Sequence, residues 1–75
     1  MERFYYSVDI DCNRTLCLSE LTDRLIFLSG QDIKERDGYF LYERRRRGNI
    51  VDIEVIAHVL SDEAALRLGQ ALNMK

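Results

Sequence analysis

The sequence predicts an α+β fold of the two-layer sandwich class, with a mainly antiparallel sheet of three to four strands and two helices on one face. Three observations lead to this prediction. Apolar and polar residues alternate near the N-terminus and again over Ile50–Leu60, which is typical of strands. Leucines recur at spacings of three and four over Leu18–Leu28 and again near the C-terminus, which is typical of amphipathic helices. Turn-forming residues separate these segments.

The first expected strand is Arg3–Ile10, in which aromatic and β-branched residues occupy every second position. A short run of turn formers ends it. The segment Leu18–Leu28 then predicts a helix that ends at Gly30, because glycine favours helix C-termini. Three residues are candidate N-caps for this helix: Asn13, Thr15 and Ser19. If Ser19 is the cap, Arg14–Leu18 can instead form a strand that pairs with the first one.

A hairpin region follows the helix. Asp32–Arg36 has a weak strand pattern, and Asp37-Gly38 gives a strong tight-turn signal before the strand Tyr39–Arg46. Gly48-Asn49 marks a second turn. Ile50–Leu60 is the clearest strand, because apolar residues alternate along its whole length.

The last helix begins after Ser61, a favoured capping residue that two acidic residues follow. Ala65, Leu68 and Leu72 form its buried stripe. The expected order is therefore β-α-β-β-β-α, or β-α-β-β-α if Asp32–Arg36 is a loop. Residues 1–75 are expected to form a single domain, since domains usually span about 50–200 residues.

The composition, with 47% hydrophobic and 32% charged residues and no proline, is that of a folded globular chain. Cys12 and Cys17 have the spacing C-x4-C and His58 is the single histidine, so we expect reduced thiols, no metal site and no cofactor. Cys17 is expected to pack as a small hydrophobic residue. The longest apolar run, Leu25–Leu28, is far shorter than the ~20 residues that span a bilayer, and no signal-peptide core is visible. We therefore expect a soluble cytoplasmic protein that has no membrane partner.

Apolar residues occupy both faces of the expected sheet, although one face of such a sheet is usually polar. A chain of 75 residues has a marginal core, so a second copy is the simplest cover for the second face. We therefore expect a homo-oligomer, with a dimer favoured, and a further protein partner. The residues expected at the self-association face are Tyr5, Leu41, Ile50, Ile56, His58 and Leu60.

An arginine run, Arg44–Arg47, lies at the end of the expected strand that begins at Tyr39. Two tyrosines of that strand, Tyr39 and Tyr42, precede the run. Arginine charge beside aromatic rings is typical of nucleic-acid binders, and arginine also suits acidic protein partners. The candidate binding residues are Arg44, Arg45, Arg46, Arg47, Tyr39 and Tyr42. The competing interpretation is a solvated strand end whose arginines pair across the hairpin with Asp52 and Glu54. The net charge of −2 favours this second interpretation.

Catalytic motifs are absent: the sequence lacks a glycine-rich phosphate loop, H-E-x-x-H and G-x-S-x-G. Glu54 lies four residues before His58, too far along a strand to orient that histidine as a general base. We therefore expect no enzymatic activity and no catalytic residues. The leading hypothesis is a small self-associating protein-interaction or regulatory module. The alternatives are a nucleic-acid-binding module that uses Arg44–Arg47 with the neighbouring aromatics, and a small-ligand-binding oligomer.

Overall fold

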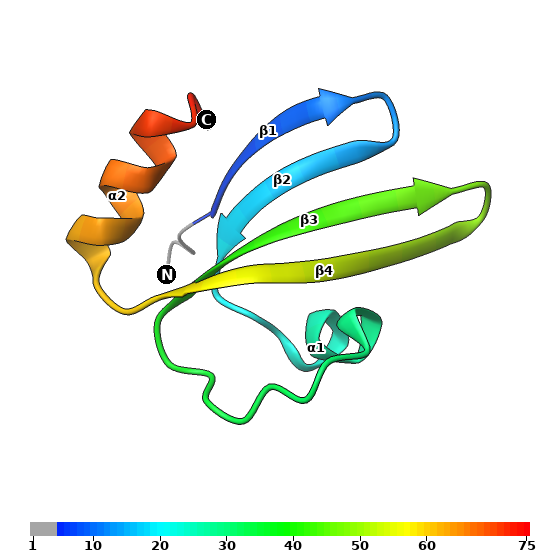
Figure 1. Ribbon diagram of the computed structural model, residues 1–75, viewed down its shortest axis with the longest axis horizontal. Coiled ribbons are helices and arrows are strands. Elements are labelled where there is room, and N and C mark those ends of the chain that lie inside the picture. Colours follow the sequence, from blue (N-terminus) through cyan, green and yellow to red (C-terminus); the bar gives the residue numbers. More distant parts are fainter. Residues whose placement is uncertain (1–4) are drawn as a thin grey trace.

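A four-stranded antiparallel sheet and two helices make up the fold. The computed structural model of the chain describes residues 5–75, so the expected strand residues Arg3 and Phe4 lie outside the described part. The elements, in chain order, are β1 (Tyr5–Asp11), β2 (Arg14–Ser19), α1 (Asp23–Ser29), β3 (Tyr39–Arg47), β4 (Ile50–Val59) and α2 (Asp62–Ala71). The strands lie in the order β1-β2-β3-β4, each antiparallel to its neighbour (Figure 1). The predicted α+β class and antiparallel sheet are confirmed.

The order of the elements agrees with the prediction only in part. The order β-α-β-β-β-α has the right number of strands and helices, but the second strand precedes α1, which gives β-β-α-β-β-α. Strand β2 corresponds to the alternative in which Arg14–Leu18 pairs with the first strand. Asp32–Arg36 is a loop rather than a strand. Its one apolar residue, Ile33, packs against the core on the α1 side, so the segment has no second apolar position to bury in a sheet.

Helix α1 begins later than the leucine spacing predicts. Thr22 is its N-cap, and the hydroxyl of Thr22 accepts a 3.2 Å hydrogen bond from the backbone N–H of Leu25. Leu18 belongs instead to β2, where it is fully buried. The leucines within and just before α1 pack against one core cluster, whereas Leu18 belongs to the other. The helical spacing therefore combined residues that point to opposite sides of the sheet.

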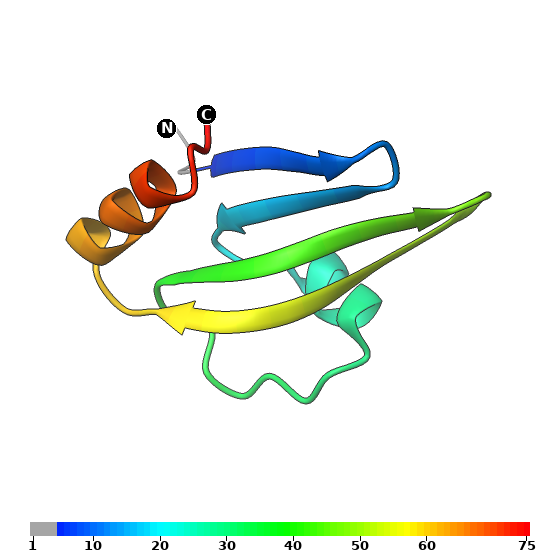
Figure 2. The ribbon, with the colours of Figure 1, turned by 45° about the horizontal axis from the view of Figure 1, so that its top comes forward.

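The two helices cover opposite faces of the sheet, which corrects the prediction of two helices on one face. Successive strand residues point to opposite faces, and the neighbouring residues Cys17 and Leu18 belong to different core clusters. The cluster on the α1 face contains Cys17, Phe40, Tyr42 and Ile53, and the cluster on the α2 face contains Leu18, Val59, Ala65 and Met74. Figures 1 and 2 show α1 beside β3 and β4, and α2 at the end of the sheet where β4 finishes. Each apolar face of the sheet thus has a helix of its own.

Helix α2 begins where the sequence predicts. The Ser61 hydroxyl accepts a 3.1 Å hydrogen bond from the backbone N–H of Ala64, and two acidic residues occupy the first turn. Gly69 is buried in the helix face that meets Tyr6 and Leu18. Gly69 thus lies where α2 packs on β1 and β2.

Local contacts cover backbone groups at both edges of the sheet. At β1, Ser7 and Lys75 exchange two backbone hydrogen bonds of 3.1 and 3.0 Å, so the last described residues lie beside this strand. At β4, the side-chain oxygen of Gln31 accepts a 2.8 Å hydrogen bond from the backbone N–H of Val55. Gln31 belongs to the loop that passes beside β4 (Figure 2). These contacts occupy edge groups that would otherwise be open to another strand.

Candidate functional site

Strand alternation divides the arginine run between the two faces of the sheet. Arg44 lies opposite Ile53, which belongs to the core on the α1 face, whereas Arg45 lies opposite Asp52. Residues two apart on a strand share a face. Arg44 and Arg46 therefore lie on the α1 face, and Arg45 and Arg47 lie on the α2 face. Arg44 is thereby separated from Arg45 and Arg47, whereas Arg46 lines hollows with both sets.

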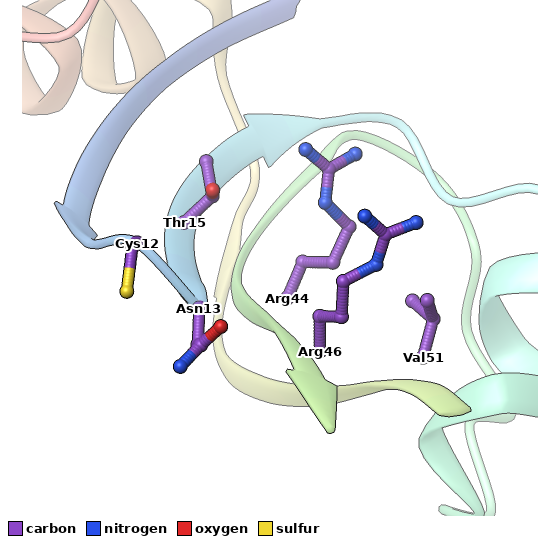
Figure 3. A pocket seen from close by; sticks show the side chains of 6 residues that line it. All are labelled: Cys12, Asn13, Thr15, Arg44, Arg46 and Val51. Carbon is purple, nitrogen blue, oxygen red and sulfur yellow. The ribbon is translucent and has the colours of Figure 1, made fainter. Parts of the chain in front are cut away.

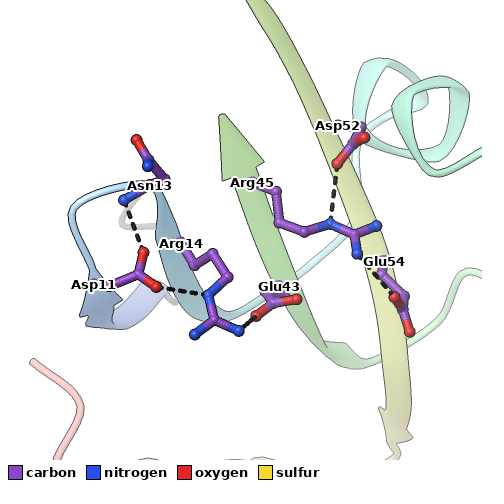
Figure 4. Close-up of polar contacts among 7 residues, drawn as sticks. All are labelled: Asp11, Asn13, Arg14, Glu43, Arg45, Asp52 and Glu54. Carbon is purple, nitrogen blue, oxygen red and sulfur yellow. Dashed lines mark hydrogen bonds and ion pairs between the residues drawn. The ribbon is translucent and has the colours of Figure 1, made fainter. Parts of the chain in front are cut away.

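On the α2 face, Arg45 and Arg14 take part in a network of ion pairs (Figure 4). Arg45 lies 3.1 Å from Asp52 and 3.3 Å from Glu54, so the expected cross-strand pairing is found at this one arginine of the run. Arg14 from β2 lies 2.8 Å from Asp11 and 3.6 Å from Glu43, the two acids that complete the network. The side chains in these pairs are all partly open to solvent, from 17% exposed at Glu43 to 57% at Glu54, and surface pairs of this kind stabilise a fold by only about 0–1 kcal/mol each.

The turn between β1 and β2 positions Arg14 for this network. The Asp11 carboxylate accepts a 2.8 Å hydrogen bond from the backbone N–H of Asn13 and another of 2.8 Å from Arg14. These two donors hold the pKa of the Asp11 carboxyl below its usual range. The hydrogen bond to Asp11 and the charge of Asp11 raise the pKa of Arg14. Asp11 and Arg14 therefore favour each other's charged form.

On the α1 face, Arg44 and Arg46 extend side by side into a cavity of about 400 Å³ (Figure 3). The other lining residues are Cys12, Asn13, Thr15 and Val51. A 2.8 Å hydrogen bond from the backbone N–H of Arg46 to the carbonyl of Asn13 fastens the β1–β2 turn to β3. Within residues 5–75, the ion pairs of the arginine run involve Arg45 and neither of the two cavity arginines. This cavity therefore carries two arginines and no acidic residue in its lining.

The two tyrosines of the candidate binding set do not line the cavity that holds Arg44 and Arg46. Tyr42 is 3% exposed, and its hydroxyl forms a 2.9 Å hydrogen bond with the hydroxyl of Ser19. Tyr39 lies at the other end of β3 on the α2 face, where its hydroxyl donates to Asp62. Neither ring is placed to stack on a base beside Arg44 or Arg46. The predicted combination of arginine charge with stacking tyrosines is not brought together here.

The buried hydroxyl of Tyr42 predicts a loss of stability at alkaline pH. Burial raises the pKa of Tyr42, so the folded state holds this proton more tightly than the unfolded state. The contribution of the protonated Tyr42 hydroxyl to the free energy of unfolding is complete below the pKa of tyrosine in the unfolded chain, which is about 10. This contribution is lost as the pH rises through the pKa of Tyr42 in the folded state. We expect the free energy of unfolding in urea to fall above pH ~10, and to fall less in Tyr42→Phe. Identical pH dependence in the two proteins would contradict this role for Tyr42.

The residues expected at a self-association face lie on several surfaces. Tyr5 and His58 lie on the α1 face, and Leu41 and Ile50 lie on the α2 face. Ile56 is the extra residue at a bulge in β4, between the pairs Leu41–Ala57 and Tyr42–Val55. Leu60 follows the end of β4 and is exposed. The His58 ring stacks on Phe40 with ring centroids 4.3 Å apart, and its Nε2 donates to the carbonyl of Asp37.

A group of apolar residues on the α2 face contains Leu41, which was expected at a self-association face, and three residues that the sequence analysis did not single out. Val8 pairs with Leu16, and Leu41 pairs with Ala57, on the face that α2 covers only in part. Each of these four residues keeps some solvent exposure, and Ala57 is exposed. We refer to Val8, Leu16, Leu41 and Ala57 as the apolar strip. Assigning Arg14–Ser19 to a strand would have revealed it, because Leu16 and Leu18 then alternate with Cys17.

In the described part of the chain, the thiols and the possible metal ligands form no cluster. Cys17 is fully buried, as predicted, and its sulfur lies 3.6 Å from the Tyr5 hydroxyl; Cys12 is exposed. Among residues 5–75, no three His, Cys, Asp or Glu side chains are placed to hold a metal ion. Nor does this part of the chain contain a helix with the length and apolar character needed to cross a membrane.

Comparison with known proteins adds no relative. No protein-family model matches the chain, and neither the curated proteins nor the solved structures give a significant match. The functional proposals for this chain rest on its own geometry.

Proposed function

We propose that this chain is a small non-enzymatic interaction module that forms a homodimer through the α2 face of its sheet. The observation that carries the proposal is the apolar strip, which lies beside α2 and retains solvent exposure. Burial of apolar surface stabilises association by roughly 25 cal/mol per Å² before the entropic cost of association. The domain is small, so a second copy adds burial that its own two core clusters do not supply.

The charges around the apolar strip favour a second copy of this chain over a strongly charged partner. The ion-pair network beside the strip carries both signs, with Arg14 and Arg45 among four carboxylates. In a twofold dimer the same surface meets itself, so a surface with both signs can place arginines of one copy against acids of the other. A surface whose charges all had one sign would repel the same surface of a second protomer.

The edges of the sheet also favour association through a face. Ser7 is paired with Lys75 beside β1, and Val55 is paired with Gln31 beside β4. Both contacts hinder a second chain from adding as a further strand. Pairing through the α2 face needs no such edge and leaves all four strands as they are.

Light scattering at micromolar concentration tests the proposal with one substitution and one matched control. Ala57→Lys places a charge in the apolar strip at an exposed position, so we expect a folded monomer, because burying an unpaired ammonium is costly. Phe27→Lys adds the same charge at an 83% exposed apolar residue of α1 and is expected to leave the dimer intact. A monomeric parent protein, or equal weakening by the two substitutions, would refute a dimer through this face.

A further inference from the structure

The cavity on the α1 face holds two guanidinium groups and no carboxylate in its lining. Arg44 and Arg46 are both exposed, and their side chains reach the same cavity (Figure 3). Within the described residues neither has an ion pair, although Arg45 between them has two on the opposite face. Like charges this close repel each other, and the repulsion is relieved when an anion lies between them. The hairpin thus neutralises one face and leaves a double positive charge on the other.

The polar groups around the two arginines suit an oxygen-rich anion. Asn13 lines the cavity, and its side-chain amide can donate two hydrogen bonds. Thr15 lies across from Arg44, but its hydroxyl donates a 3.1 Å hydrogen bond to Asp9. Asp9 is therefore engaged by Thr15 and lies one strand farther away than Thr15 from Arg44. The available donors are two guanidinium forks and one amide.

We propose that this cavity binds a small phosphate monoester as its dianion. Two unpaired guanidinium groups carry two positive charges, which a monoester with a charge of about −1.5 to −2 neutralises and a single carboxylate does not. Arginine forks form paired, charge-assisted hydrogen bonds to phosphate oxygens. A volume of about 400 Å³ holds the phosphate and part of the group it esterifies. Val51 supplies an apolar wall against which that group can pack.

A second hollow at the same end of the sheet can be compared with the cavity of Arg44 and Arg46. It measures about 280 Å³ and is lined by Asp11, Asn13, Arg14, Arg45, Arg46 and Arg47. Its lining includes the carboxylate of Asp11, and Arg14 and Arg45 are engaged in ion pairs. An anion in this hollow would compete with those carboxylates. Arg44 belongs to the first cavity alone, and Arg45 and Arg47 belong to the second alone.

The proposed phosphate site is independent of the proposed dimer. The apolar strip lies on the α2 face, whereas the cavity arginines lie on the α1 face. Variants that keep the protein monomeric can therefore bind phosphate, and variants that lose phosphate can still dimerise. Failure of one proposal leaves the other standing.

Nuclear magnetic resonance titration of the ¹⁵N-labelled chain at low ionic strength tests the site with three probes. These are methyl phosphate, dimethyl phosphate and acetate, which differ in charge and in the number of anionic oxygens. We expect saturable shifts at Asn13, Thr15, Arg44 and Arg46 with methyl phosphate. Binding should strengthen as the pH rises through the second phosphate pKa near 6, because the dianion then forms. Dimethyl phosphate and acetate should bind more weakly by about tenfold or more, since each carries one charge.

Two double variants with equal charge change provide the control. Arg44→Gln with Arg46→Gln should weaken methyl phosphate binding by about tenfold or more, since it removes the charge-assisted hydrogen bonds of both guanidinium groups. Arg45→Gln with Arg47→Gln removes the same charge from the α2 face and should change binding by less than about threefold. Equal losses in the two variants would show a diffuse charge effect, and the absence of saturable shifts would show no site. Either outcome overturns the proposal, as would tighter binding of the diester, which is the phosphate form of a nucleic-acid backbone.

Discussion

Leu18→Ala is expected to destabilise the domain by about 3 kcal/mol, because replacing a fully buried leucine removes apolar contacts and leaves a cavity. Leu18 is 0% exposed and sits in β2 against the core of the α2 face. It faces Gly69 of α2, so the cavity would open where helix and sheet meet. Urea unfolding followed by circular dichroism measures the effect. For a domain of this size such a loss is a large share of the total stability.

The matched control for Leu18 is another leucine with the opposite environment. Leu60 is 74% exposed after the end of β4, so Leu60→Ala should change stability by less than about 0.5 kcal/mol. A loss below about 1 kcal/mol at Leu18 would mean that the α2 core collapses to fill the gap. It would also mean that α2 is only loosely held on the sheet.

Gly38→Ala is expected to have an effect of similar size through the backbone. Gly38 has a φ of 87°, and a Cβ atom placed there would lie 2.7 Å from the carbonyl oxygen of Val59. Non-glycine residues at positive φ are strained by about 1–2 kcal/mol. The contact with backbone adds to this, because neither the start of β3 nor the end of β4 can move without breaking their pairing. We expect a total loss of about 2–4 kcal/mol by thermal or urea unfolding.

Gly48 separates the two parts of that effect. It has a φ of 60°, and a Cβ placed there meets no atom within 4 Å. Gly48→Ala therefore reports the conformational strain alone, which should be about 1 kcal/mol. If Gly38→Ala and Gly48→Ala are equally destabilising, the contact between the added Cβ and Val59 adds nothing to the destabilisation at Gly38.

Elements that depend only on neighbouring residues in the chain could be predicted from the sequence. The Gly48-Asn49 turn, strand β4 and the Ser61 cap of α2 lie where predicted, because each depends on residues adjacent in the chain. The segment Arg14–Ser19 was ambiguous because Leu18 fits a helical leucine spacing as well as a strand alternation. The neighbouring strands explain why this segment is extended. β2 lies between β1 and β3, and only an extended segment can form backbone hydrogen bonds with both.

The candidate site was predictable in its residues but not in its arrangement. Alternation along a strand separates Arg44 and Arg46 from Arg45 and Arg47, and this could be read from the sequence once β3 was assigned. The sequence also predicted Asp52 and Glu54 as cross-strand partners, but it did not show which arginine pairs with them, because that depends on register: both acids contact Arg45, while Ile53 and Val51 lie opposite Arg44 and Arg46. The placement of the helices on opposite faces depends likewise on which residues of β2 and β3 face each way.

The strand order has a consequence for the speed and route of folding. Because the strands lie side by side in chain order, β1–β2 and β3–β4 are hairpins that close across short turns. Only the β2–β3 pairing must close a long loop, the one that contains α1. Loop closure of this kind carries the main entropic barrier. The two hairpins can therefore form early and independently. We expect the docking of β2 on β3 to be the rate-limiting step of folding. Cys17 in β2 and Leu41 in β3 form contacts in that step.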